Sequence, residues 1–144
     1  MRPIITTLLF TGMRIGELLA LQWKHIDFAT HTITIAQSVT RELTCDENGQ
    51  PLDMTYVLGP TKTRTSHRVI QAPELVLNRL REWMRYVETL PKGLEVLTPE
   101  GFVFISTRTM SMRTYSGFRA SYRHFLDRNG FSGEGLNLHR YRHT

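Results

Sequence analysis

A run of alternating apolar and polar residues between two segments of helical periodicity most constrains how this chain folds. The run covers residues 31–39, and the residues on one of its faces are Ile33, Ile35, Gln37 and Val39. A period of two is typical of a half-buried strand. Two further extended runs, 55–58 and 67–71, follow it, with turn-forming residues at 46–51 and a basic loop at 59–66. We therefore expect a small antiparallel sheet.

Helical periodicity covers most of the remaining chain. The predicted helices are residues 3–10, residues 13–23 after a break at Thr11 and Gly12, a segment from Pro73 to the residue before Pro91, and residues 115–128. The apolar positions of the third helix, three and four apart, are Leu75, Val76, Leu80, Trp83, Met84 and Val87. Those of the fourth are Phe118, Tyr122, Phe125 and Leu126. The predicted fold class is α+β, mostly helical with a small antiparallel sheet.

The composition limits the class of protein. At 144 residues the chain is long enough for one domain with a core. Lys and Arg number 18 against 13 Asp and Glu, and the formal charge of +5 favours a polyanionic partner. Cys45 is the single cysteine, which excludes an intrachain disulfide and a cysteine metal cluster and fits a reducing cytosol. No segment approaches the roughly 20 apolar residues that span a bilayer, so no membrane association is expected.

The first segment that can carry chemistry is residues 11–23, TGMRIGELLALQW. Gly12 can end one helix and leave the amides of the next free, while Arg14 in that first turn adds a guanidinium fork. Both can then converge on a phosphate. A solvated ion pair between Arg14 and Glu17 explains the same residues without any ligand.

The second segment is residues 60–68, PTKTRTSHR, between two predicted strands of a hairpin. The ammonium group of Lys62 at a hairpin tip can reach into a groove, and it can donate a proton to a leaving oxygen if its pKa is lowered. The alternative is a solubilising turn.

The third segment is residues 139–144, HRYRHT. On a helix, His139 and Arg142 share a face, so an imidazole and a guanidinium can approach two oxygens of one phosphate. His139 and His143 have a spacing that can bind a metal. However, no acidic or cysteine ligand lies close in the sequence, and the neighbouring cationic side chains repel a metal ion. We therefore expect no metal site.

In their order and spacing, these three segments resemble the motifs of the tyrosine recombinases, in particular the integrases of phages and conjugative transposons. Residues 11–23 match the family's arginine motif, residues 61–68 its lysine hairpin and residues 139–144 its H-x-x-R motif. The resemblance spans essentially all 144 residues. It implies the family's mostly helical catalytic fold and favours the chemical interpretation of each segment.

The resemblance implies that a tyrosine attacks a DNA phosphate and forms a 3′-phosphotyrosyl bond that is later reversed, with no metal or other cofactor. Arg14 and Arg142 would hold the two non-bridging oxygens. Lys62 would be the general acid for the leaving 5′ oxygen, and His139 would act in proton transfer near the nucleophile. Further contacts with flanking phosphates are expected from Arg64, Arg68 and Arg140, with Arg113, Arg119 and Arg123 as additional candidates.

The implied partners are double-stranded DNA and other recombinase protomers, assembled as a tetramer on DNA, and the implied location is the cytoplasm, for a bacterial or phage-encoded protein of a mobile genetic element. The family pattern continues past the H-x-x-R motif to a tyrosine nucleophile, which residues 1–144 do not contain after Arg142. We therefore expect a partial catalytic domain without the N-terminal DNA-binding domain and the C-terminal tyrosine segment. Such a chain would hold a DNA phosphate without cleaving it alone.

Two other functions remain open at this point. One is a non-catalytic module that binds DNA or associates with a full-length recombinase and inhibits it. The other is a metal or small-ligand domain that uses His139 and His143.

Overall fold

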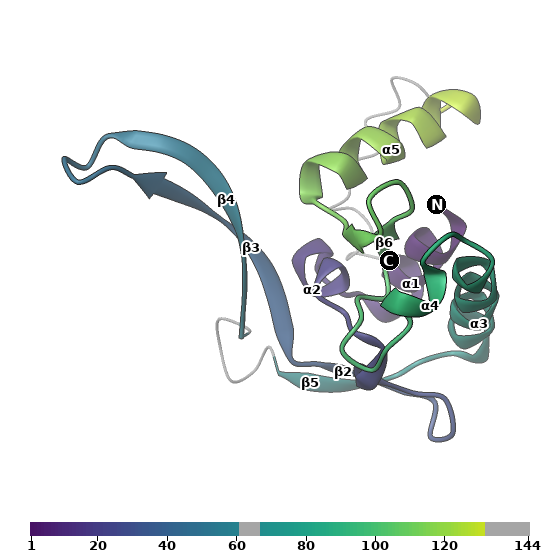
Figure 1. The fold of residues 1–144 in the computed structure, drawn as a ribbon. Coiled ribbons are helices and arrows are strands. Elements are labelled where there is room, and N and C mark those ends of the chain that lie inside the picture. The colour runs from purple at the N-terminus through teal and green to yellow at the C-terminus, as the bar shows by residue number, and fades with distance from the viewer. Residues whose placement is uncertain (61–66, 132–144) are drawn as a thin grey trace.

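The first helix ends where the sequence predicts. The computed structural model describes residues 1–60 and 67–131 (Figure 1). Its first element, α1 (Arg2–Thr11), has Pro3 in the first turn and ends at Gly12. The φ angle of Gly12 is 61°, in the left-handed region that glycine adopts without a steric cost. The predicted helix at 3–10 and its break are confirmed.

The second helix is shorter than predicted. The elements in this part of the chain are α2 (Ile15–Leu19), the 3-10 turn η1 (Trp23–His25) and β1 (Ile26–Asp27). The cause is tertiary, because the Trp23 amide donates to the Gly101 carbonyl at 3.1 Å and Gln22 forms a bridge with Phe102. These bonds with a distant segment replace the helical bonds that the periodicity of residues 13–23 predicts.

The next strands form two antiparallel sheets. They are β2 (Thr32–Ile35), β3 (Gln37–Cys45), β4 (Pro51–Pro60) and β5 (Arg68–Gln71). β2 and β3 follow each other directly along the chain. β2 pairs with β5, and β3 pairs with β4. β1 joins the other edge of β2. Antiparallel pairing is confirmed, but the strands belong to separate sheets and not to one.

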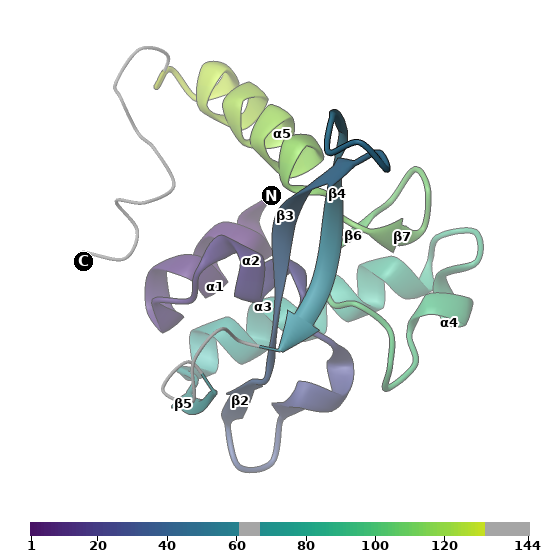
Figure 2. The same ribbon diagram turned by 90° about the vertical axis from the view of Figure 1, so that its left-hand side faces the viewer.

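The β3–β4 ribbon extends away from the helical part of the molecule (Figure 1) and faces the viewer in the turned view (Figure 2). Its tip is a turn in which the Asp46 carboxylate accepts hydrogen bonds from the amides of Asn48 and Gln50, at 2.9 and 2.8 Å. Gly49 there has a φ of 77°. The turn predicted at 46–51 is confirmed, since it depends on local side-chain chemistry.

The predicted hairpin around Lys62 is wrong in its connectivity. β4 and β5 do not pair with each other, because each has its own partner on the continuous β2–β3 run: Pro60 pairs with Gln37, and Arg68 pairs with Ile35. Residues 61–66 therefore join two sheets. The segment itself lies outside the described residues.

The remaining elements cover the core. They are α3 (Glu74–Glu88), α4 (Gly93–Val96), β6 (Ile105–Ser106), β7 (Ser111–Met112) and α5 (Tyr115–Arg128). β6 and β7 form a short antiparallel hairpin. The bounds of α5 agree with the predicted helix at 115–128, and the Thr114 hydroxyl caps it by accepting a hydrogen bond from the Gly117 amide. Among the described residues, no helix is long and apolar enough to cross a membrane.

One apolar position of α3 was assigned to the wrong side. Leu75 is 46% exposed, whereas Leu77, absent from the predicted stripe, is fully buried. The buried stripe consists of Val76, Leu77, Leu80 and Val87. The first three of these pack in the same core as α1 and α2. Leu75 falls one position outside this stripe, and spacing alone could not distinguish the two leucines.

Gly16 allows α2 to pack directly against the backbone of β3. A Cβ atom at this position would lie 2.5 Å from the Val39 carbonyl oxygen and 2.7 Å from the Ser38 hydroxyl. Real Cβ atoms do not approach a backbone oxygen this closely, so any larger residue must displace α2 or β3. This contact fixes the position of the turn that carries Arg14.

We predict that Gly16→Ala lowers the free energy of unfolding by about 1 to 3 kcal/mol, because the added methyl group overpacks this contact. Urea denaturation followed by circular dichroism measures the loss. Gly59→Ala is the matched control, since a Cβ there meets no atom within 4 Å, and a change below about 0.5 kcal/mol is expected. Equal losses in the two variants would contradict the packing argument.

Candidate active site

A buried carboxylate, that of Glu17, organises the start of α2. The Glu17 side chain is 1% exposed, and its Oε2 accepts a hydrogen bond of 2.8 Å from the Arg14 amide. This is the carboxylate half of a capping box, in which the third helical residue satisfies the amide of the N-cap residue. Arg14 is therefore the N-cap of α2 and does not lie within its first turn.

Two guanidinium groups share this carboxylate. Arg14 donates from Nη1 to Oε1 of Glu17 at 3.1 Å. Arg68, from β5, donates from Nη1 to Oε1 at 3.1 Å and from Nη2 to Oε2 at 2.9 Å. The fork of Arg68 thus binds the carboxylate with two hydrogen bonds, the geometry that gives Arg–carboxylate pairs their strength and direction. We call these three residues the arginine–glutamate cluster.

The cluster presents a positive charge to solvent. Two guanidinium groups and one carboxylate leave one net positive charge, and the Arg14 side chain is 50% exposed while that of Arg68 is 32% exposed. Among the described residues, the Arg14 guanidinium donates to Glu17 alone, and half of its side chain is open to solvent. A half-exposed guanidinium held by a buried carboxylate is suited to binding an oxyanion.

The ionised state of Glu17 depends on its arginine partners. Burial by itself raises the pKa of the Glu17 carboxyl, but the hydrogen bonds from the Arg68 side chain and from the Arg14 backbone outweigh burial and lower the pKa below its ordinary value of 4.5. The carboxylate is therefore charged at neutral pH, as its role as the shared acceptor requires.

We predict that Glu17→Gln lowers the free energy of unfolding by about 2 to 3 kcal/mol, since two guanidinium groups lose their buried counterion. The estimate lies at or below the lower limit of about 3 kcal/mol for a broken buried pair, because both arginines are partly exposed. Chemical denaturation near neutral pH measures the loss. The control is Glu82→Gln, which removes the exposed partner of Arg79 and should cost less than about 1 kcal/mol. If the two variants lose the same stability, Glu17 is not the organising group.

The stabilisation by Glu17 should also depend on pH. Because its pKa is lower in the folded state than the ordinary 4.5, the contribution is fully present above that value and is lost as the pH falls through the folded pKa. The stability difference between the unmodified chain and Glu17→Gln should therefore shrink below pH 4.5. Denaturation series across this range measure it, and a constant difference would argue against an ionised Glu17.

Of the residues predicted for the site, the structure describes Arg14 and Arg68, and it also describes the additional candidates Arg113, Arg119 and Arg123. Arg14 and Arg68 lie together on Glu17, for which the sequence suggested a solvated pair with Arg14 or a structural role in orienting the helix or Arg142. That pair exists, but its carboxylate is buried. The pairing of Glu17 with Arg68 was missed, and no local signal reveals it because the two residues are 51 positions apart. The predicted residues that lie outside the described part of the chain are Lys62, Arg64, His139, Arg140, Arg142 and His143.

The comparisons with known proteins identify the family. The family model described as "Phage integrase family" matches residues 1–144. The chain belongs to the phage integrase family. A tyrosine recombinase XerC-like protein of Caldanaerobacter subterraneus is 30% identical over 138 residues, which are 93% of this chain and 34% of that protein. The ICEBs1 integrase of Bacillus subtilis is 28% identical over 144 residues, 99% of this chain and 35% of that protein.

Solved structures show the integrase-family fold. The Tn1549 transposon integrase, solved in complex with a circular intermediate DNA, matches with a TM-score of 0.72 at 21% identity over 99% of this chain and 43% of that one. The XerA recombinase matches with a TM-score of 0.65 at 18% identity over 98% of this chain and 40% of that one. The predicted recombinase fold is confirmed. The chain spans about a third of the length of the curated relatives it matches.

Proposed function

We propose that this chain forms the phosphate-binding part of the catalytic domain of a site-specific DNA recombinase, which cleaves and rejoins DNA through a phosphotyrosyl intermediate. The observation that carries the proposal is Arg14, which the buried Glu17 carboxylate holds at 3.1 Å while half of its side chain faces solvent. Membership of the phage integrase family gives this arginine its chemical context.

Arg14 matches the chemistry of phosphoryl transfer. Such a reaction asks the protein mainly to position the phosphate and to stabilise the negative charge that develops on its oxygens. A guanidinium that is already oriented by Glu17 loses little freedom when it binds a non-bridging oxygen. Arg68, which binds Glu17 with both Nη atoms, fits a positioning role better than the direct contact with a flanking phosphate that the sequence suggested.

Lys62, His139 and Arg142 complete the proposed catalytic set. Support for Lys62 comes from the ends of its segment, since Pro60 pairs with Gln37 and Arg68 binds Glu17. The chain therefore leaves β4 and returns beside the arginine–glutamate cluster. His139 and Arg142 rest on the match of residues 139–144 to the family motif. Arg64 and Arg140 remain proposed contacts with flanking phosphates.

The proposed partners are double-stranded DNA and further recombinase protomers. Several similar structures contain a recombinase in complex with DNA, which is a transposon right end, a circular intermediate or a XerH substrate. The formal charge of +5 suits such a polyanion. We place the reaction in the cytoplasm, where bacterial DNA lies, and in the movement of a mobile element, as for the ICEBs1 and Tn1549 relatives.

We predict that Arg14→Ala, in the recombinase that contains this segment, reduces the rate of strand cleavage by about 10² to 10³, the typical loss for one oxyanion donor. A suicide DNA substrate that traps the covalent adduct on a denaturing gel measures the rate. The control is Arg85→Ala on α3, an exposed arginine with the same charge, which should change the rate less than about twofold. Equal rates for Arg14→Ala and the unmodified protein would overturn the proposal.

The 144-residue polypeptide by itself is predicted to bind DNA without forming a covalent adduct. In the family pattern the nucleophile follows the H-x-x-R motif, whereas the five tyrosines of this sequence all precede Arg142: Tyr56, Tyr86, Tyr115, Tyr122 and Tyr141. The same trapping assay tests this prediction. A tyrosyl adduct mapped to any of these five residues would contradict it.

A further inference from the structure

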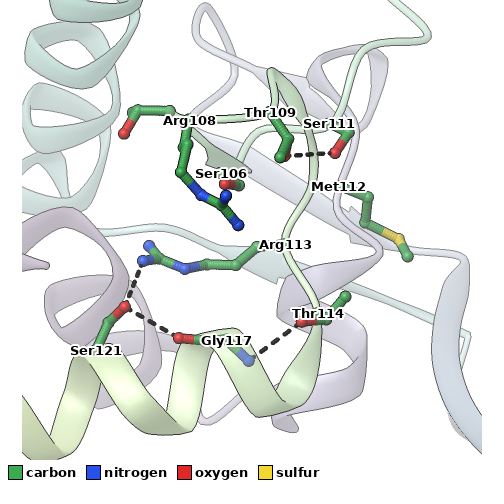
Figure 3. Close-up of a pocket in the computed structure, with 10 residues that line it drawn as sticks. Ser106, Arg108, Thr109, Ser111, Met112, Arg113, Thr114, Gly117 and Ser121 are labelled. Carbon is green, nitrogen blue, oxygen red and sulfur yellow. Dashed lines mark hydrogen bonds between the residues drawn. The ribbon is translucent and has the colours of Figure 1, made fainter.

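A second cationic feature lies at the hairpin of β6 and β7, where it meets the start of α5. The structure contains a cleft there with a volume of about 510 Å³. Its polar lining includes Ser106, Arg108, Ser111, Arg113, Thr114 and Ser121 (Figure 3). We call it the hairpin cleft. None of its lining residues belongs to the arginine–glutamate cluster.

Two guanidinium groups enter the hairpin cleft from different positions. Arg108 lies in the turn between β6 and β7, and Arg113 is the residue that follows β7. Both side chains extend into the cleft (Figure 3). Arg113 is held in place, because its Nη2 donates to the Ser121 hydroxyl at 2.8 Å and that hydroxyl donates to the Gly117 carbonyl at 2.9 Å. The cleft therefore has one fixed fork and one exposed fork.

Among the described residues, no ion pair balances these charges. Residues 101–126 contain no Asp or Glu, although they contain four arginines. The ion pairs found among the described residues involve Arg14, Lys24, Arg68 and Arg79, and none involves Arg108 or Arg113. Burial lowers the pKa of the Arg113 guanidinium from its ordinary value, which is the mark of a charge that has lost water without gaining a counterion. Two like charges in one cleft repel each other, and an anion between them relieves both costs.

We propose that the hairpin cleft binds a phosphate of the DNA backbone at a position separate from Arg14, with Arg108 and Arg113 as its two guanidinium donors. The hydroxyls of Ser106 and Thr107, which also line the cleft, can supply further donors, and arginine forks match phosphate oxygens. A small apolar ligand fits poorly, because such ligands occupy mainly hydrophobic pockets. Among the described lining residues, only Met112 has an apolar side chain. This inference rests on the proposed DNA-binding function.

Salt-dependent binding to duplex DNA tests the proposal. Fluorescence anisotropy with a labelled duplex of about 20 base pairs gives the dissociation constant of the 144-residue chain at several salt concentrations. The variants are Arg108→Gln, Arg113→Gln and the double variant. Arg85→Gln on α3 is the matched control, since it removes the same charge from an exposed arginine that does not line the cleft. Thermal denaturation shows whether Arg113→Gln folds. If that variant does not fold, Arg108→Gln still tests the proposal, because Arg108 is exposed.

The expected result is a loss of affinity of about tenfold in the double variant and a fall of about one in the slope of log affinity against log salt, the value for one phosphate contact. Arg85→Gln should stay within about twofold and keep the slope. An unchanged slope in Arg108→Gln and in the double variant overturns the proposal.

The source of the phosphate is tested by amide NMR on Gly117 and Ser121. Shifts on addition of the duplex, absent in Arg108→Gln, support a backbone phosphate. Shifts with millimolar inorganic phosphate but none with the duplex mean a free-phosphate site and overturn the proposal. Failure of this proposal can be distinguished from failure of the proposed function. The rate of strand cleavage by Arg14→Ala tests the arginine–glutamate cluster, whereas the salt dependence of DNA binding by Arg108→Gln tests the hairpin cleft.

Discussion

The ion pairs of Glu17 with Arg14 and Arg68 are the interaction on which the candidate site depends. α2 has five residues, too few to be stable as a helix on its own. It is held by its cap on one side, where Glu17 accepts from the Arg14 amide, and by backbone contact with β3 at Gly16 on the other. The same carboxylate reaches β5 through Arg68, so one buried charge joins a helix, a strand and the functional arginine.

This arrangement explains why a costly buried charge is useful. Replacing such a cluster with apolar residues often leaves stability unchanged or improved, so its value lies in the direction it gives to Arg14. The hairpin cleft differs, because Arg108 and Arg113 meet there and none of the described lining residues carries a carboxylate. In the first case an internal counterion orients an arginine, and in the second an external anion would complete the charge balance.

Local chemistry made several elements predictable, and distant contacts set the limits. The break at Gly12, the turn at Asp46 and the bounds of α5 follow from residues within one or two turns of each other. The helix from Met13 was predicted too long because Trp23 bonds to Gly101, 78 positions away. The pairing of Glu17 with Arg68 could not be predicted for the same reason, since the two residues are 51 positions apart. Family motifs supplied Lys62, His139 and Arg142, since composition and periodicity assign no partner to them.

A double-mutant cycle of Glu17→Gln and Arg14→Ala, read as the affinity of the chain for duplex DNA, tests most directly whether Glu17 acts through Arg14. The general effect of removing one negative charge is present in both backgrounds and cancels in the cycle. The account predicts that Glu17→Gln costs more affinity when Arg14 is present, with a coupling energy of about 0.5 to 3 kcal/mol. Additive effects, with a coupling energy below about 0.3 kcal/mol, would contradict it.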